Sequence, residues 1–191
     1  IDNKEHLKGT VKIDNFINAD VKDFLSKMNE VEDSSKSDEE WVNTCENWKN
    51  IWPVYLKRYE SEEKINKYTF IDYLCKYLKD DTAVISDAGS SYYVTSQALR
   101  IEKDQRYITS GAQADMGFTL PAAIGVTVAK GGDSVGITGD GSFQMNIQEL
   151  QTLVEGQYPV KLFVWNNNGY LSIRTTQRKF FDGREIGTDS N

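Results

Sequence analysis

Apolar and polar residues along the second half of the chain follow the pattern of alternating strands and helices. Short apolar runs predict three strands, 83–86, 134–138 and 160–165, and the last is expected to be buried on both faces. Apolar residues at helical spacing predict three helices, 70–78, 117–129 and 147–154. We expect Asn146 to cap the start of the last helix and Gly156 to follow its end. This alternation predicts an α/β fold: a doubly wound parallel sheet with helices on both faces.

The first third of the chain has a different pattern. Residues 21–28 have helical periodicity after a short extended segment at 11–13. The stretch from Glu30 to Glu40 then loses its apolar content and contains six acidic residues, which predicts an exposed linker and a domain boundary.

Aromatic residues mark a further predicted helix after this linker. Trp41, Cys45, Trp48 and Trp52 recur at helical spacing, and Pro53 is expected to end or bend the helix. An aromatic stripe of this kind could bind a ligand, but packing against a core is the interpretation that we favour.

Composition and charge exclude several classes of function. The net charge of −7 argues against a nucleic acid or an anionic membrane as partner, since both would require a basic face. The longest apolar run, near 120–129, is too short to span a bilayer, and no secretory signal precedes the first helix, so we expect a cytoplasmic protein. The chain begins at Ile1 without a methionine, which is the pattern of a fragment.

Cysteine and histidine offer little chemistry. His6 is the only histidine, which excludes a histidine-rich metal site and disfavours a Ser-His-Asp triad. Cys45 and Cys75 lie among apolar neighbours, so we expect small buried side chains rather than a disulfide or a nucleophile. Acid–base chemistry must therefore come from carboxylates or from a cofactor.

Polar residues follow two of the predicted strands directly. Gly139-Asp140-Gly141 follows the strand 134–138, and Asn166-Asn167 follows the strand 160–165. If these strands are neighbours, their ends lie about 5 Å apart, and carboxylate and amide oxygens are ligands that suit Mg²⁺. The glycines let the backbone approach a phosphate. A plain turn between a strand and a helix would also use Gly-Asp-Gly. The specific evidence for a binding site is therefore the pair of asparagines at a fixed distance after it.

This arrangement resembles the thiamine diphosphate binding motif, in which Gly-Asp-Gly is followed after 24 residues by paired asparagines. The surrounding segments GDGSFQMNIQELQTLV and PVKLFVWNNNGY are similar to acetolactate synthase and its relatives. So are three upstream segments, 87–91, 109–111 and 116–125. The resemblance implies the end of a central domain at 1–30 and an acidic linker with a connecting helix at 31–66. It implies the diphosphate-binding domain at 67–191, truncated at its C-terminus.

The resemblance also implies roles for individual residues. Asp140, the Asn167 side chain and the carbonyl of Gly169 would hold Mg²⁺. Five residues would bind the diphosphate: Gly139, Gly141, Ser142, Ser90 and Ser91. Met116 would lie beneath the bent cofactor, and Ala114 would meet its pyrimidine ring. From the residues alone, Met116 is better explained as a core side chain, and only the resemblance favours the role beneath the cofactor.

The function implied by the resemblance is that of a 2-oxo acid decarboxylase or carboligase, a transferase or lyase that uses thiamine diphosphate and Mg²⁺ on a small 2-oxo acid. The activating glutamate belongs to an N-terminal domain of another subunit. We therefore expect no catalytic residue in this fragment, no activity from it alone, and a homodimer or tetramer. Whether the parent protein also binds FAD is left open.

One segment departs from the acetolactate synthase pattern. Residues 171–176 (LSIRTT) replace the usual Gly-Met-Val and Gln-Trp stretch, and the run to Phe181 is more similar to synthase-like proteins of polysaccharide or nucleotide-sugar pathways. Arg174 is either a ligand for a substrate carboxylate or a surface helix arginine. A non-catalytic homologue that retains the fold is the other alternative. A dinucleotide-binding domain is disfavoured because no strand leads into G-x-G-x-x-G.

Overall fold

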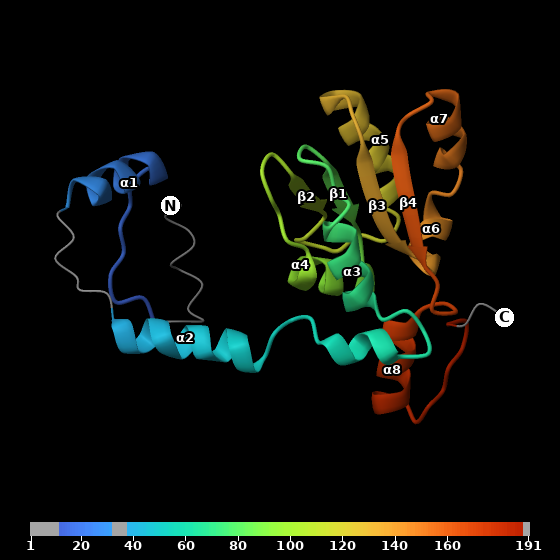
Figure 1. Ribbon diagram of the computed structural model, residues 1–191, viewed down its shortest axis with the longest axis horizontal. Coiled ribbons are helices and arrows are strands. Elements are labelled where there is room, and N and C mark those ends of the chain that lie inside the picture. Colours follow the sequence, from blue (N-terminus) through green and yellow to red (C-terminus); the bar gives the residue numbers. More distant parts are fainter. Residues whose placement is uncertain (1–11, 32–37, 189–191) are drawn as a thin grey trace. The chain divides into compact units, whose positions relative to one another are not determined.

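The computed structural model describes residues 12–31 and 38–188, and the chain divides into two units, Ile1–Ile51 and Trp52–Asn191 (Figure 1). In the first unit lie the helices α1 (Val21–Glu30) and α2 (Glu39–Ile51). Asp20 caps α1 by accepting a hydrogen bond from the backbone N–H of Lys22 (2.8 Å). The extended segment predicted at 11–13 is no strand where it is described, and most of the acidic linker lies outside the described residues. The domain assignments stay predictions.

The aromatic helix forms where the periodicity placed it, but in the described part of the chain none of its residues is buried in a core. Helix α2 ends at Ile51, two residues before Pro53. Trp41 and Trp48 meet edge to face with their ring centroids 5.5 Å apart, and both remain exposed. The packing expected for this stripe is therefore wrong. Cys45 and Cys75 are free and half-buried.

The second unit confirms the predicted α/β fold with a parallel sheet. Four strands make up the sheet in the described residues: β1 (Ala83–Ser86), β2 (Arg106–Thr109), β3 (Ser134–Gly139) and β4 (Val160–Trp165). All neighbours are parallel, in the order β2-β1-β3-β4. Strand β2 was not predicted, because its residues are polar or only half-buried at the edge of the sheet.

Helices cover both faces of this sheet. Because side chains alternate along a strand, Val84 faces one way while Ala83 and Ile85 face the other. Val84 packs in one cluster with Ile71 of α3 (Lys67–Cys75) and Val94 of α4 (Ser90–Ala98). Ala83 and Ile85 pack with α5 (Thr119–Lys130). The remaining elements of this unit are η2 (Lys57–Ser61), α6 (Asp140–Met145), α7 (Glu149–Glu155) and α8 (Leu171–Phe180).

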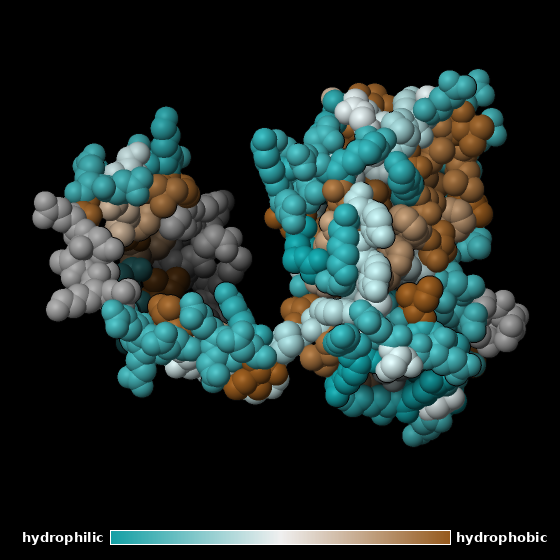
Figure 2. Space-filling model, in the orientation of Figure 1, coloured by the Kyte–Doolittle hydropathy of each residue, from teal (hydrophilic) through white to brown (hydrophobic). Residues whose placement is uncertain are grey.

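Two local predictions in this unit are wrong. Strand β4 is not buried on both faces, since Lys161 and Val164, whose side chains point to opposite faces, are both exposed. Apolar side chains near β4 and α7 reach the surface, as Figure 2 shows. The helix predicted at 147–154 forms as α7, two residues later at its start, but the Asn146 side chain donates to the carbonyl of Gly117 instead of capping it. Gly156 does follow the end of α7, although its backbone is right-handed and the left-handed residue is Gln157.

No helix within residues 12–31 and 38–188 is long and apolar enough to cross a membrane.

Candidate cofactor site

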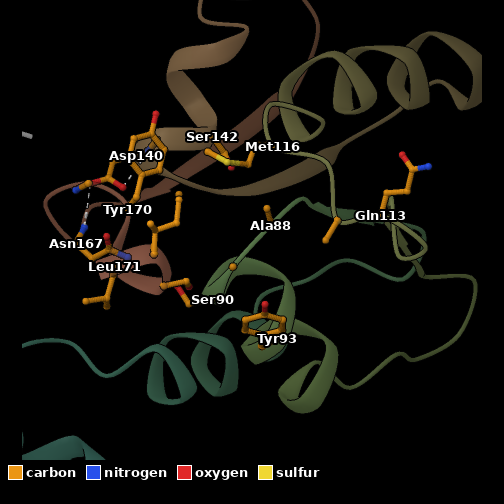
Figure 3. A pocket seen from close by; sticks show the side chains of 17 residues that line it. Ala88, Ser90, Tyr93, Gln113, Met116, Asp140, Ser142, Asn167, Tyr170 and Leu171 are labelled. Carbon is orange, nitrogen blue, oxygen red and sulfur yellow. Dashed lines mark hydrogen bonds between the residues drawn. The ribbon is translucent and has the colours of Figure 1, made fainter. Parts of the chain in front are cut away.

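A cavity of about 360 Å³ opens beyond the carboxyl ends of the strands. The chain leaves β1 toward β2 on one side and β3 toward β4 on the other, so the crevice between β1 and β3 is the switch point where open parallel sheets bind ligands. In Figure 3, Asp140 and Asn167 lie at one end of this cavity and Gln113 at the other. The segments after all four strands supply the lining: Ala88, Gly89, Ser90, Tyr93, Gln113, Ala114, Met116, Gly139, Asp140, Gly141, Ser142, Asn167, Gly169, Tyr170, Leu171, Ser172 and Ile173.

Asp140 joins the two halves of the predicted motif. It follows β3 directly and is the first residue of α6. Its Oδ1 accepts from the N–H of Gly141 (2.9 Å), and its Oδ2 accepts from the N–H groups of Asn167 (3.3 Å) and Gly169 (2.7 Å). The last two belong to the loop after β4, which lies beside Asp140 because β3 and β4 are paired neighbours. The two polar segments therefore do converge.

The oxygen atoms around this loop fit a magnesium ion. Asn167 Oδ1 is buried and has no hydrogen-bond partner in the described structure, an arrangement that costs about 1–3 kcal/mol unless something else binds the oxygen. The carbonyl of Gly169 accepts from Leu171 N–H (3.0 Å), which leaves it one lone pair. No group of three His, Cys, Asp or Glu residues converges among residues 12–31 and 38–188. A metal here would therefore rely on one carboxylate with amide and carbonyl oxygens, a set that suits Mg²⁺.

The structure supports neither of the two predictions for Arg174, a ligand for a substrate carboxylate or a surface arginine. It is only 8% exposed, so the surface arginine is wrong. Its guanidinium donates to the carbonyls of Asn167 (2.9 Å), Asn168 and Thr188 (3.0 Å). With these bonds made, the geometry gives no support to a substrate carboxylate as its ligand. Arg174 instead holds the loop that carries Asn167, and this role depends on a fold that brings α8 under the loop.

Position 141 requires a glycine because the ring of Tyr170 lies very close to its backbone. A Cβ built on Gly141 would lie 2.5 Å from the ring of Tyr170, closer than real Cβ atoms come to any neighbour. The Tyr170 ring can therefore pack against the start of α6 only because residue 141 has no side chain. This contact brings the loop after β4 against the turn after β3.

The two serines predicted to bind the diphosphate follow β1, but they have different surroundings. Gly89, with φ +60°, opens α4 in a conformation that favours glycine. Ser90 is the first residue of α4 and lines the cavity, next to a helix N-terminus of the kind that favours anions. Ser91 is buried, and its hydroxyl donates to Asp87 Oδ1 (2.9 Å) and the Ala88 carbonyl (2.7 Å). The diphosphate contact predicted for the Ser91 side chain is therefore not supported.

Asp87 explains why this turn is fixed. Its carboxylate is fully buried and accepts from the hydroxyls of Thr138 (2.7 Å) and Ser91 and from the N–H of Ala88 (2.7 Å). Thr138 lies in β3, directly before Gly139. The turn after β1 is thereby tied to the strand that presents Asp140.

Ala114 and Met116 belong to the part of the cavity wall that follows β2. Both line the cavity, on the segment between β2 and α5, and both are half-buried. Ala114 has φ 55°, a strained value for a residue with a Cβ, and such strain is concentrated at functional sites. The predicted roles of both residues, like those of Gly139, Gly141 and Ser142, which also line the cavity, stay predictions.

Lys67 is a charged neighbour of the site that no sequence motif indicated. Its ammonium donates to Ser90 Oγ at 2.6 Å. Burial lowers the pKa of Lys67, and the more distant Asp140 carboxylate acts in the opposite direction. The signal in the sequence was a lysine at the first position of a helix, where the dipole disfavours a cation.

Comparison with known proteins agrees with this geometry. Residues 87–191 match the family described as the thiamine pyrophosphate enzyme, C-terminal TPP binding domain. The acetolactate synthase large subunit of Buchnera aphidicola subsp. Acyrthosiphon pisum (strain APS) is 37% identical over 169 residues, which are 86% of this chain and 29% of that protein. The isozyme 3 large subunit of Escherichia coli (strain K12) is 38% identical over 147 residues, 76% of this chain and 25% of that protein.

The chain thus spans less than a third of the length of these curated relatives. The family match begins at Asp87 and includes the turn after β1, the Asp140 turn and the Asn167 loop. It therefore covers all four segments that line the cavity, including the one after β2. This chain belongs to the thiamine pyrophosphate enzyme family and carries its C-terminal, cofactor-binding domain.

Proposed function

We propose that this chain is the diphosphate- and magnesium-binding part of an acetolactate synthase-like enzyme that decarboxylates or ligates 2-oxo acids. The observation that carries the proposal is the convergence of Asp140, Asn167 and Gly169 beside a buried amide oxygen without a donor. The similarity to acetolactate synthase large subunits supports the reaction class.

The residues of this chain would bind and orient the cofactor. Asp140 and Asn167 would hold Mg²⁺ with the Gly169 carbonyl, while the start of α4 and the glycine-bounded turn after β3 would receive the diphosphate. When bound, thiamine diphosphate supplies a carbon nucleophile and an acceptor for the electrons released by decarboxylation. Met116, which lines the same cavity, would support the bent cofactor from below.

The rest of the active site would come from outside these residues. The family resemblance places the activating glutamate in a pyrimidine-binding domain of another subunit. We therefore propose a homodimer or tetramer, with no turnover by these 191 residues alone. Binding of FAD by the parent protein and a cytoplasmic location stay predictions.

The cavity wall after β4 bears on the choice of substrate. Leu171, Ser172 and Ile173 line the cavity, and they belong to the segment that departs from the acetolactate synthase pattern. Because an altered wall changes which substrate fits, this observation favours the alternative of a synthase-like enzyme of polysaccharide or nucleotide-sugar metabolism with a product other than acetolactate.

Calorimetry on the full-length protein tests cofactor binding. We expect thiamine diphosphate to bind in the presence of Mg²⁺ and not in excess chelator. Asp140→Asn should weaken this binding by on the order of 100-fold, since it removes a charged ligand. Asp182→Asn, at a side chain that is 94% exposed, makes the same change of charge away from the cavity and should leave binding intact. Equal affinity with Mg²⁺ and with chelator would end the proposal.

A screen of 2-oxo acids against the same protein, with CO₂ release and ligated products as readouts, tests the reaction. Turnover identifies the substrate. Tight cofactor binding without turnover of any 2-oxo acid would favour the non-catalytic homologue.

A further inference from the structure

Lys67 is a half-buried cation directly behind the wall of the cavity. It is the first residue of α3, and its ammonium lies 2.6 Å from Ser90 Oγ and 5.5 Å from the centroid of the Trp165 ring. Ser90 lines the cavity and Lys67 does not. Lys67 therefore reaches the cavity through Ser90.

The surroundings of Lys67 leave its charge poorly compensated. Burial disfavours an ammonium that lacks an anionic partner, and the start of a helix disfavours a cation as well. Within the described residues, no carboxylate lies within ion-pair distance of its ammonium. The lowered pKa of Lys67, caused first by burial, is consistent with this cost. Such a charge is stabilised when an anion enters the neighbouring cavity.

The hydrogen bond to Ser90 has a fixed direction. A lysine ammonium has donors and no acceptor, so Ser90 Oγ must accept from Lys67. The hydroxyl proton of Ser90 is then free to be donated elsewhere. Because Ser90 lines the cavity, that proton is available to an acceptor bound there.

The cavity itself needs a positive charge. Asp140 is the one formally charged side chain among the lining residues, and it is negative. A diphosphate adds further negative charge, of which Mg²⁺ neutralises only a part.

We propose that Lys67 is a positioning residue for the diphosphate: it turns the Ser90 hydroxyl toward the phosphate oxygens and supplies a fixed positive charge behind them. This inference rests on the proposed function. It gives Lys67, which lies outside the matched family segment, a role in selecting ligands that carry phosphate groups.

Binding of three ligands to the full-length protein separates this role from a purely structural one. The ligands are thiamine diphosphate, thiamine monophosphate and unphosphorylated thiamine, each titrated with Mg²⁺ by calorimetry. We expect Lys67→Met to weaken thiamine diphosphate binding by about 10-fold or more and thiamine binding hardly at all, because only the phosphates interact with the charge. Lys67→Arg, which keeps the charge, should restore part of the affinity. Lys130→Met, at an exposed lysine at the end of α5, is the control for net charge.

The outcomes separate the two proposals. If the wild type shows no Mg²⁺-dependent binding of thiamine diphosphate, the proposed function fails and this inference falls with it. If the wild type binds and Lys67→Met binds all three ligands as well as the wild type does, only this inference is overturned. An equal loss for all three ligands would show a structural role and would also overturn it. Should Lys67→Met not fold, Lys67→Gln in the same comparison decides the question.

Discussion

The carboxylate of Asp140 accepts a 2.7 Å hydrogen bond from the backbone N–H of Gly169, 29 positions further along the chain. The bond crosses from the end of β3 to the end of β4, and the Asn167 N–H donates to the same oxygen. The loop that would supply Asn167 and Gly169 to the metal is therefore held in place by Asp140, the predicted carboxylate ligand. A change at one of these residues will alter the position of the others, which makes the following measurements informative.

Asn167→Ala should separate stability from function. Its buried Oδ1 has no donor among the described residues, so removal of the side chain relieves a desolvation cost, and we expect the free energy of unfolding without metal to stay equal or to rise by about 1 kcal/mol. The Mg²⁺ affinity measured with thiamine diphosphate should fall by about 10-fold or more. A clear loss of metal-free stability in chemical denaturation would show that the oxygen has a structural partner instead.

Arg174→Met should destabilise the loop that carries Asn167. The change removes a buried guanidinium that donates to three backbone carbonyls, and we expect a loss of about 2–3 kcal/mol in chemical denaturation. Arg174→Lys should recover little of this, since an ammonium cannot reproduce the planar fork. Arg178→Met, on an exposed part of the same helix, is the matched control and should change little. Equal effects at both positions would contradict the loop-holding role.

Gly141→Ala and Gly139→Ala form a matched pair in one turn. A Cβ at Gly141 would lie 2.5 Å from the Tyr170 ring, so the ring or the turn must move, at a cost of about 1–3 kcal/mol. A Cβ at Gly139 meets nothing within 4 Å, so that variant should melt close to the wild type. Thermal melting of both variants checks this, and equal destabilisation would argue against the Tyr170 contact.

Asp72 should make stability depend on acid pH. The hydrogen bond from Lys76 lowers the pKa of Asp72 below its ordinary 3.8, against the opposing effect of burial, and Arg100 lowers it further. A carboxyl group whose pKa is lowered by folding contributes its full stabilisation at pH values above its pKa in the unfolded chain. The contribution is lost as the pH falls through its lower pKa in the folded protein. Asp72→Asn should therefore lower the Tm by about 2 °C at pH 7 and by less near pH 3. A difference in Tm that does not change with pH would refute the linkage.

Much of the fold was predictable because it depends on local pattern. The runs 83–86 and 134–138 became β1 and β3, since strands in the middle of a parallel sheet are buried on both faces and therefore consist mostly of apolar and small residues. The edge strand β2 was missed because its residues are polar or half-buried, and the exposure of β4 was mispredicted because an apolar run does not reveal what packs over each face of a strand.

Within the site, the sequence by itself determined the chemistry and the spacing: Asp140 and Asn167 follow strands whose order along the chain allowed them to be neighbours. It also identified the family, through residues whose types suit a metal and a diphosphate. Only the tertiary structure decided what each remaining side chain faces. It turned Ser91 and Arg174 inward onto hydrogen-bond partners and brought Lys67 of α3 against Ser90 of α4. Those contacts join segments that are distant along the chain, and their geometry is set by helix packing, which no local pattern contains.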